Sequence, residues 1–224
     1  MAITVNVDGV GRNVPTSQVN IDGIWRDVET VSNNVDGAWK VSCPNYFTIT
    51  ADNRNMVGYT DETTELNIPK FFVGEDNIKY KVTGIDSQAF RQCSNLISVN
   101  IPNSVTFIES AAFANCTSLS SINLPNSITR FGTNVVFYGC TSLTSIIIPN
   151  SISDIPEATF QSCTSLAEIV LPNSITSIGT QAFFKCDNLT TVYYTGTEEQ
   201  WNAITVSINN DPLINATKVF NYTG

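Results

Sequence analysis

Apolar and polar positions recur along most of this chain with a period of about 23 residues. Each unit carries a phenylalanine, a cysteine and a leucine at fixed spacing, as in the segment 112–119. Four units align directly, over residues 100–122, 123–146, 147–169 and 170–192, with one insertion near Asn134. A divergent copy precedes them from Asn67, with its own insertion over residues 74–79, and a last copy begins at Tyr193. One such unit cannot bury its apolar side chains alone, so the pattern predicts a solenoid of stacked coils with a shared core.

Three segments of each unit predict local structure. The Leu-x-x-Ile-x-Leu stretch alternates as a strand does, and the proline that follows stops it. The Asn-Ser-Ile-Thr-x-Ile run after the proline predicts a second short strand, and Ala-Phe-x-x-Cys-x-x-Leu predicts one or two helical turns. The aromatic and leucine positions predict stacked apolar ladders. These are Phe90, Phe113, Phe137, Phe160 and Phe183, and Leu96, Leu119, Leu143, Leu166 and Leu189.

The full pattern, Asn-Ser-Ile-Thr-x-Ile-x-x-x-Ala-Phe-x-x-Cys-x-x-Leu-x-x-Val-x-Leu-Pro, resembles the BspA-like leucine-rich repeats of bacterial surface proteins. Residues 192–204 and 215–219 are similar to the closing segment of that family, and the resemblance covers about residues 47–222. It implies an α/β-type leucine-rich-repeat solenoid, mostly β with short helical turns, over residues 44–224. Capping segments are expected at 44–80 and 193–224. The resemblance also implies adhesion and recognition at an extracellular surface.

Residues 1–43 repeat with a shorter spacing of 14 residues. Each copy places Asp-Gly between β-favouring apolar residues, which is the strongest short signal for a two-residue hairpin because both turn residues need positive φ. We therefore expect a small all-β module of three hairpins before the solenoid. Trp25 and Trp39 share one column and are expected to pack across strands.

These hairpin units resemble the Val-x-Val-x-Gly-x-Trp-Lys repeats of tail-associated proteins of phages and prophages. The resemblance implies an attachment or spacer module that contacts other virion or tail subunits through residues 1–43. The alternative is a small β cap that shields the first coil, because an open solenoid end exposes its core. Both interpretations stay open at this point.

Composition narrows the range of partners. The chain has 224 residues, a formal net charge of −9 and no histidine. An acidic chain without a basic cluster is repelled by phosphate backbones and anionic headgroups, so we expect no nucleic-acid binding. No segment approaches 18 uninterrupted apolar residues, and the first residues lack the features of a signal peptide, so we expect no membrane insertion. An extracellular location would then require a signal that was removed or another export route.

Five of the six cysteines occupy one column of the repeat: Cys93, Cys116, Cys140, Cys163 and Cys186, with Cys43 outside it. Their spacing is that of the repeat and not of a metal-ligand motif, so we expect no metal site. The column is interpreted as a ladder of small buried thiols. The alternative is a disulfide between thiols of adjacent coils.

Catalytic residues are sparse. Without histidine the commonest general base is missing, and the chain has neither a Gly-x-Ser-x-Gly elbow nor a glycine-rich phosphate loop. One carboxylate pair remains, because Asp86 and Glu109 occupy the same column on neighbouring coils. Their separation could approach the roughly 5 Å of retaining glycosidases. We interpret the two carboxylates as a solvated like-charge pair on the outer edge or as a loose cation site, with catalysis as the remote alternative, and no cofactor is expected.

The outward residues of the first strand of each unit form two columns across the predicted concave face. The columns are Ser98, Ser121, Ser145, Glu168 and Thr191, and Asn100, Asn123, Ile147, Val170 and Tyr193. The face is nearly uncharged and changes from polar in the early coils to apolar and aromatic in the late ones. We expect the ligand to bind here, since an exposed apolar patch on a solenoid face is typical of a binding surface. The alternative is that outward β-branched residues simply favour strands.

The sequence thus predicts a non-enzymatic recognition or adhesion protein that binds a protein or glycan ligand on a cell surface through this face. A structural spacer or assembly subunit of a phage-type or tail-like particle is the alternative function. A carboxylate-based glycosidase is a third hypothesis, and it requires turnover by Asp86 and Glu109.

Overall fold

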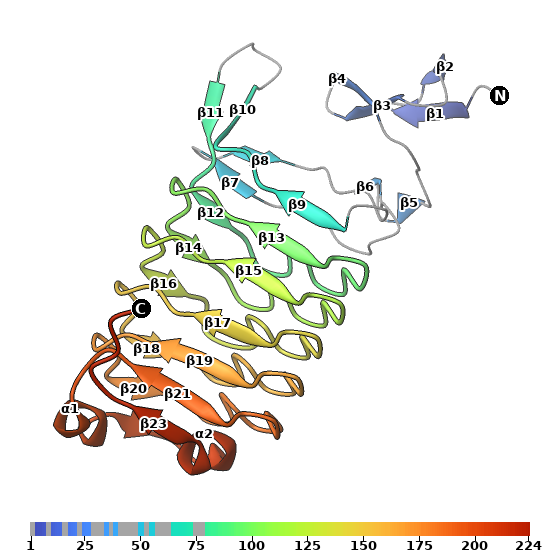
Figure 1. The fold of residues 1–224 in the computed structure, drawn as a ribbon. Coiled ribbons are helices and arrows are strands. Elements are labelled where there is room, and N and C mark those ends of the chain that lie inside the picture. The colour runs from blue at the N-terminus through green and yellow to red at the C-terminus, as the bar shows by residue number, and fades with distance from the viewer. Residues whose placement is uncertain are drawn as a thin grey trace.

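The structure is a computed structural model that describes residues 64–73 and 79–224, together with the strands found between residues 3 and 56. Side chains are described for residues 64–71 and 81–224. Within these ranges the chain forms a mostly β solenoid in which successive coils stack in one direction, with the C-terminal helices at one end (Figure 1). The solenoid fold and its β character are therefore confirmed.

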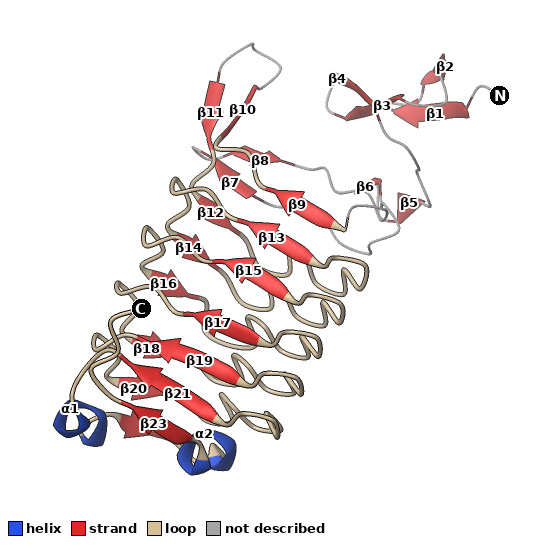
Figure 2. Ribbon diagram, in the orientation of Figure 1, coloured by secondary structure: helices blue, strands red, loops and turns tan. Residues whose placement is uncertain are grey.

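One strand from each coil contributes to a first parallel sheet (Figure 2). Its strands pair in register, with Ser98 opposite Ser121 and Val170 opposite Tyr193. Inward residues of these strands, such as Val99 and Ile169, are buried. The strands are β9 (Glu65–Asn67), β13 (Ser98–Asn100), β15 (Ser121–Asn123), β17 (Ser145–Ile147), β19 (Glu168–Leu171), β21 (Thr191–Tyr194) and β23 (Thr217–Val219).

The Asn-Ser-Ile-Thr-x-Ile run forms the second strand of each coil, as the pattern predicts. These strands have two residues each and also pair in parallel, as Ile108 does with Phe131. They are β12 (Gly84–Ile85), β14 (Phe107–Ile108), β16 (Arg130–Phe131), β18 (Asp154–Ile155), β20 (Ser177–Ile178) and β22 (Thr205–Val206).

Both sheets divide at the same step of the solenoid. The first splits into β15-β13-β9 and β17-β19-β21-β23, and the second into β12-β14-β16 and β18-β20-β22. Equivalent residues lie 23 positions apart before this step, as in the bond from Thr129 to Thr106, but 24 apart across it, as in the bond from Thr141 to Thr117. The division therefore coincides with the extra residue near Asn134.

The third side of each coil departs from the helical turn that the sequence predicts. The Ala-Phe-x-x-Cys segment forms tight turns instead, and among the described residues only α1 (Glu198–Asn202) and α2 (Asp211–Asn215) are helices. Two residues per coil have positive φ, for example Gln88 at 62° and Gln92 at 65°. The physical reason is that alternate N–H groups bond to the next coil, as Phe90 N does to Ala112 O at 2.7 Å, so they cannot form intrahelical bonds.

The core consists of the predicted ladders. Phe90, Phe113, Phe137, Phe160 and Phe183 are completely buried. Their rings stack, with centroid distances of 4.9, 5.6, 5.5 and 5.4 Å between successive phenylalanines. Offset stacking at these separations is favourable beyond the area it buries. The apolar side chains of each coil are thus buried against those of the neighbouring coils.

The abundant serines and threonines also have a structural use. Ser127 Oγ donates to Val105 O at 2.6 Å, and Ser174 Oγ donates to Ile152 O at 2.6 Å. Thr106 Oγ1 donates to Thr83 O at 3.1 Å in the same coil-to-coil direction. The two serine hydroxyls bond to carbonyl groups that no backbone N–H reaches in the described structure, whereas Thr83 O accepts both the N–H and the hydroxyl of Thr106.

The C-terminal segment closes the core. Asn210 is fully buried; its Oδ1 accepts from Phe183 N at 2.9 Å, and its Nδ2 donates to Gly179 O at 2.9 Å. In the preceding coil Phe160 N binds a backbone oxygen, Ala182 O, at 2.8 Å. The amide side chain therefore takes the place of the backbone of a further coil.

The amino-terminal strands form antiparallel pairs. The pairs within residues 3–56 are β1 (Ile3–Val7) with β2 (Val10–Val14), β3 (Gln18–Ile21) with β4 (Ile24–Asp27), β5 (Asn34–Val35) with β6 (Ala38–Trp39), and β7 (Ile49–Ala51) with β8 (Arg54–Met56). A further pair, β10 (Phe71–Val73) with β11 (Lys79–Lys81), flanks residues 74–78. The packing predicted for Trp25 and Trp39 lies outside the described side chains. The division at residue 43 stays a prediction.

Candidate functional site

All ten predicted ligand-binding residues lie at outward positions of the first sheet. We call this surface the ladder face and define it by the two columns that the strand register sets. The first column is Glu65, Ser98, Ser121, Ser145, Glu168, Thr191 and Thr217, and the second is Asn67, Asn100, Asn123, Ile147, Val170, Tyr193 and Val219. The outer members from β9 and β23 were not predicted, because those two strands lack the repeat pattern.

The early part of the second column is an amide ladder. Asn123 Nδ2 donates to Asn100 Oδ1 at 3.3 Å, and Asn100 Nδ2 donates to Asn67 Oδ1 at 3.3 Å. All three asparagines are exposed. Because each amide bonds to the next, much of the hydrogen-bonding capacity of these side chains is used within the protein. This part of the face is polar, but it has fewer hydrogen-bonding groups left for a ligand.

The late part of the same column is apolar. Ile147 is 68% exposed and Val219 is 38% exposed, with the half-buried Val170 and Tyr193 between them. The ring of Tyr193 contacts that of Tyr222, with centroids 4.6 Å apart. Charged residues are few here, since Glu168 is the one acidic or basic residue among the described outward positions of the late strands. The strip is therefore an exposed apolar and aromatic surface beside the hydroxyls of Ser145, Thr191 and Thr217.

The carboxylate pair has a structural partner. Glu109 forms an ion pair with Arg130 at 2.6 Å, and the Arg130 guanidinium lies 4.6 Å from the centroid of the Phe107 ring. Phe107 in turn covers Gly84, where an added Cβ would lie 2.0 Å from its ring. Glu109 thus holds Arg130 against Phe107 on the outer surface of the second sheet. This contact is structural and does not support the glycosidase hypothesis.

Four cysteines of the column are free and buried: Cys116, Cys140, Cys163 and Cys186. Each thiol donates to the carbonyl of a phenylalanine in the preceding coil, as Cys116 Sγ does to Phe90 O at 2.9 Å and Cys140 Sγ to Phe113 O at 3.2 Å. Burial raises the pKa of Cys116 to about 12 and that of Cys140 well above its ordinary value. The thiol ladder is therefore a structural feature with low reactivity.

Cys93 differs from the rest of the column because it is disulfide-bonded. The interpretation of the column as thiols alone is thus wrong at this position, and Cys43 lies outside the described residues.

No group of three or more His, Cys, Asp or Glu side chains within the described residues could hold a metal ion. In the described part of the chain, no helix is long and apolar enough to cross a membrane.

The fold and the ladder face define a leucine-rich-repeat solenoid. The family model "BspA type Leucine rich repeat region" matches residues 83–205 in six copies, and the chain belongs to this family. Proteins with such repeats are typically surface-associated and bind proteins or other ligands without catalysing a reaction. The resemblance of residues 1–43 to phage-tail repeats stays a prediction.

Solved structures place this chain among bacterial leucine-rich-repeat proteins. A leucine-rich cell surface protein from Faecalibacterium prausnitzii is 30% identical with a TM-score of 0.58, and the match covers 85% of this chain and 42% of that protein. The T. pallidum leucine-rich repeat protein is 27% identical with a TM-score of 0.56, over 72% of this chain and 71% of that one. This chain thus spans less than half the length of the first protein.

The pneumococcal vaccine antigen PcpA shares the fold, with 17% identity and a TM-score of 0.52 over 75% of this chain and 44% of that one. No curated protein matches the sequence.

Proposed function

We propose that this protein is a non-enzymatic recognition or adhesion protein, and that it binds a protein or glycan ligand of a cell surface through the ladder face. The observation that carries the proposal is the apolar strip of Ile147, Val170, Tyr193 and Val219 on an otherwise polar surface. Ile147 and Val219 are exposed, Val170 and Tyr193 are half-buried, and the strand register places these four side chains next to one another. Other exposed apolar side chains of the described residues, such as Ile97 and Ile208, lie outside the two columns. A contiguous apolar strip of this kind is typical of a binding surface.

The chemistry of the strip suits a ligand that presents an apolar surface with hydroxyl or amide groups beside it. Val170 and the Tyr193–Tyr222 pair supply a stiff apolar platform. The hydroxyls of Ser145, Thr191 and Thr217 flank that platform. Both the apolar face of a sugar ring and an extended peptide with small side chains meet this description.

The test is binding of the purified protein to intact bacterial cells, isolated cell-wall glycans and host matrix proteins. The double variant Val170→Lys with Tyr193→Lys places two ammonium groups in the strip. We expect saturable binding to one ligand class by the native protein and a loss of at least about tenfold in the variant, because unpaired charges in a buried interface are costly.

The matched control carries the same charge change on the second sheet, as Ser177→Lys with Thr205→Lys. Thermal unfolding of both variants establishes that each keeps the fold. Equal loss of binding in the two double variants would attribute the effect to net charge and would overturn the assignment of the ladder face. Binding to none of the three ligand classes would favour the structural-subunit alternative.

A further inference from the structure

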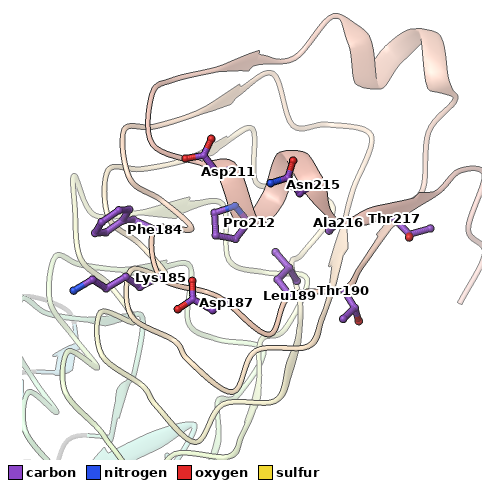
Figure 3. Close-up of a pocket in the computed structure, with 10 residues that line it drawn as sticks. All are labelled: Phe184, Lys185, Asp187, Leu189, Thr190, Asp211, Pro212, Asn215, Ala216 and Thr217. Atoms are coloured by element: carbon purple, nitrogen blue, oxygen red, sulfur yellow. The ribbon is translucent and has the colours of Figure 1, made fainter.

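A pocket of about 610 Å³ lies at the C-terminal end of the solenoid, between the turn of the last complete coil and α2 (Figure 3). This volume lies within the range of small-ligand sites. Its apolar lining includes Phe184, Leu189 and Pro212, and its charged lining consists of Lys185, Asp187 and Asp211. Figure 3 shows Asp187 and Asp211 on opposite sides of Pro212. The pocket shares only Thr217 with the ladder face.

A repeated backbone donor precedes this pocket along the solenoid. In four successive coils, a residue with positive φ directs its N–H to a carbonyl oxygen of the next coil. The bonds are Gln92 N to Ala114 O at 2.7 Å, Asn115 N to Tyr138 O at 2.6 Å, Gly139 N to Gln161 O at 2.8 Å and Ser162 N to Phe184 O at 2.8 Å. The geometry is thus a fixed property of each coil, aimed toward the C-terminal end.

Lys185 is the next member of this series, and its φ of 61° matches those of its four predecessors. The closing segment satisfies two other donors of the same coil, since Gln181 N binds Ile208 O at 3.0 Å and Phe183 N binds Asn210 Oδ1 at 2.9 Å. Among the hydrogen bonds of residues 81–224, none uses the Lys185 N–H. A donor that meets a carbonyl oxygen in each of the four preceding coils therefore lacks that partner at Lys185, and Lys185 lines the pocket.

We propose that this pocket binds an extended peptide segment that carries a basic side chain. A backbone carbonyl of the segment accepts from Lys185 N–H, in the position that the next coil occupies elsewhere in the solenoid. The basic group of the segment pairs with Asp187 and Asp211, and its alkyl stem packs on Phe184, Leu189 and Pro212. The segment thus continues the coil-to-coil bonding where the chain's own repeat ends.

The charges of the pocket favour this ligand over an acidic one. Two carboxylates face one ammonium group, and the Lys185 ammonium lies 5.6 Å from the centroid of the Phe184 ring. Asp187, Asp211 and Lys185 are all exposed at the rim, so their charges are available to a ligand. An acidic side chain would meet both carboxylates and would be repelled.

The experiment is a titration of the ¹⁵N-labelled full chain with the blocked tripeptide acetyl-Gly-Lys-Gly-amide, followed by the amide resonance of Lys185. The matched probes replace lysine by norleucine or by glutamate. We expect a saturable shift of the Lys185 amide with the lysine peptide. Binding should be at least about fivefold weaker for the norleucine peptide and weaker again for the glutamate peptide.

Two protein variants locate the site. Asp187→Asn with Asp211→Asn removes both exposed carboxylates and should weaken the lysine peptide about fivefold, to the level of the norleucine peptide. The ladder-face variant Val170→Lys with Tyr193→Lys should bind the lysine peptide as the native protein does, which separates this site from the proposed function. Equal affinity for all three peptides, or shifts that leave the Lys185 amide unmoved, would overturn the proposal.

Discussion

The interior of the solenoid and its ladder face share the same repeat, but residue types stay constant in the main interior columns and vary along the ladder face. Inside, every complete coil supplies the same residue to the phenylalanine, cysteine and leucine columns, so five phenylalanine rings stack and four thiols bind four phenylalanine carbonyls. Outside, the second column changes from asparagine to isoleucine, valine and tyrosine along the same strands. Repetition inside fixes the fold, whereas variation outside makes one end of the face chemically distinct. The two regions should therefore respond differently to substitution.

The largest effect is expected in the aromatic ladder. Phe137→Ala removes a fully buried ring that stacks on Phe113 and Phe160, and it leaves a cavity shared by three coils. The free energy of unfolding should fall by about 3–5 kcal/mol. Urea unfolding followed by circular dichroism measures it, with Ile147→Ala on the exposed face as the control. A loss below about 1 kcal/mol for Phe137→Ala would contradict the shared-core account.

The second effect concerns the end of the interior. Asn210→Ala leaves Phe183 N and Gly179 O without their side-chain partners in a buried site. We expect a loss of about 2–3 kcal/mol, since each unsatisfied buried group costs about 1–3 kcal/mol. Asn215→Ala on the neighbouring exposed helix is the matched control and should change stability little. Equal values for the two variants would mean that the carboxamide of Asn210 does not close the solenoid.

The third effect concerns the thiol ladder and its pH dependence. Cys140→Ala removes the donor to Phe113 O and should cost about 1–2 kcal/mol. Burial raises the folded pKa of Cys116 and Cys186 to about 12, so the neutral thiol is favoured by folding. That stabilisation is present below the unfolded pKa of about 8.5 and is lost as the pH rises from there toward 12.

Alkylation by iodoacetamide tests the same thiols. We expect Cys116, Cys140, Cys163 and Cys186 to stay unmodified in the native protein at pH 8.5 and to react fully in urea. Mass spectrometry of tryptic peptides identifies each site. Rapid modification of any of the four under native conditions would show that its thiol is neither buried nor held neutral.

The smallest effect on stability is expected on the ladder face. Ile147→Asn places a fourth asparagine in the second column, across the division between β15 and β17, and shortens the apolar strip without touching the core. The free energy of unfolding should change by less than about 0.5 kcal/mol, while ligand binding on intact cells should weaken. Ser177→Asn on the second sheet, outside the ladder face, is the control. A large loss of stability with unchanged binding would reverse the roles assigned to the two regions.

The sequence predicted the parts of the structure that repeat. The phenylalanine and leucine columns, both strands of each coil and the outward positions of the first sheet all follow from the 23-residue period. The prediction of helical turns was wrong, because the pattern reports which residues are buried but not whether their N–H groups bond within a coil or between coils. Left-handed residues such as Ala111 and Val135, with φ of 57° and 50°, give no sequence signal of their conformation.

The features that sequence reasoning missed lie where the repeat ends. Asn210 replaces a backbone carbonyl, and the pocket around Lys185 lies where the closing segment within residues 193–224 packs on the last repeat. Both features lie in or beside the closing segment, which does not follow the 23-residue repeat, so the periodicity of the sequence could not predict them. The disulfide at Cys93 was missed for a related reason, since its place in the column gave it the same interpretation as four free thiols.

Hydroxyl-radical footprinting of the protein, free and bound to the ligand identified in the cell, glycan and matrix panel, tests the central claim most directly. The account predicts that binding protects Ile147, Val170 and Tyr193, while Phe107 on the second sheet keeps its reactivity. Protection of Phe107 with no change at Tyr193 would show that the partner binds the other side of the solenoid and would contradict the assignment of the ladder face.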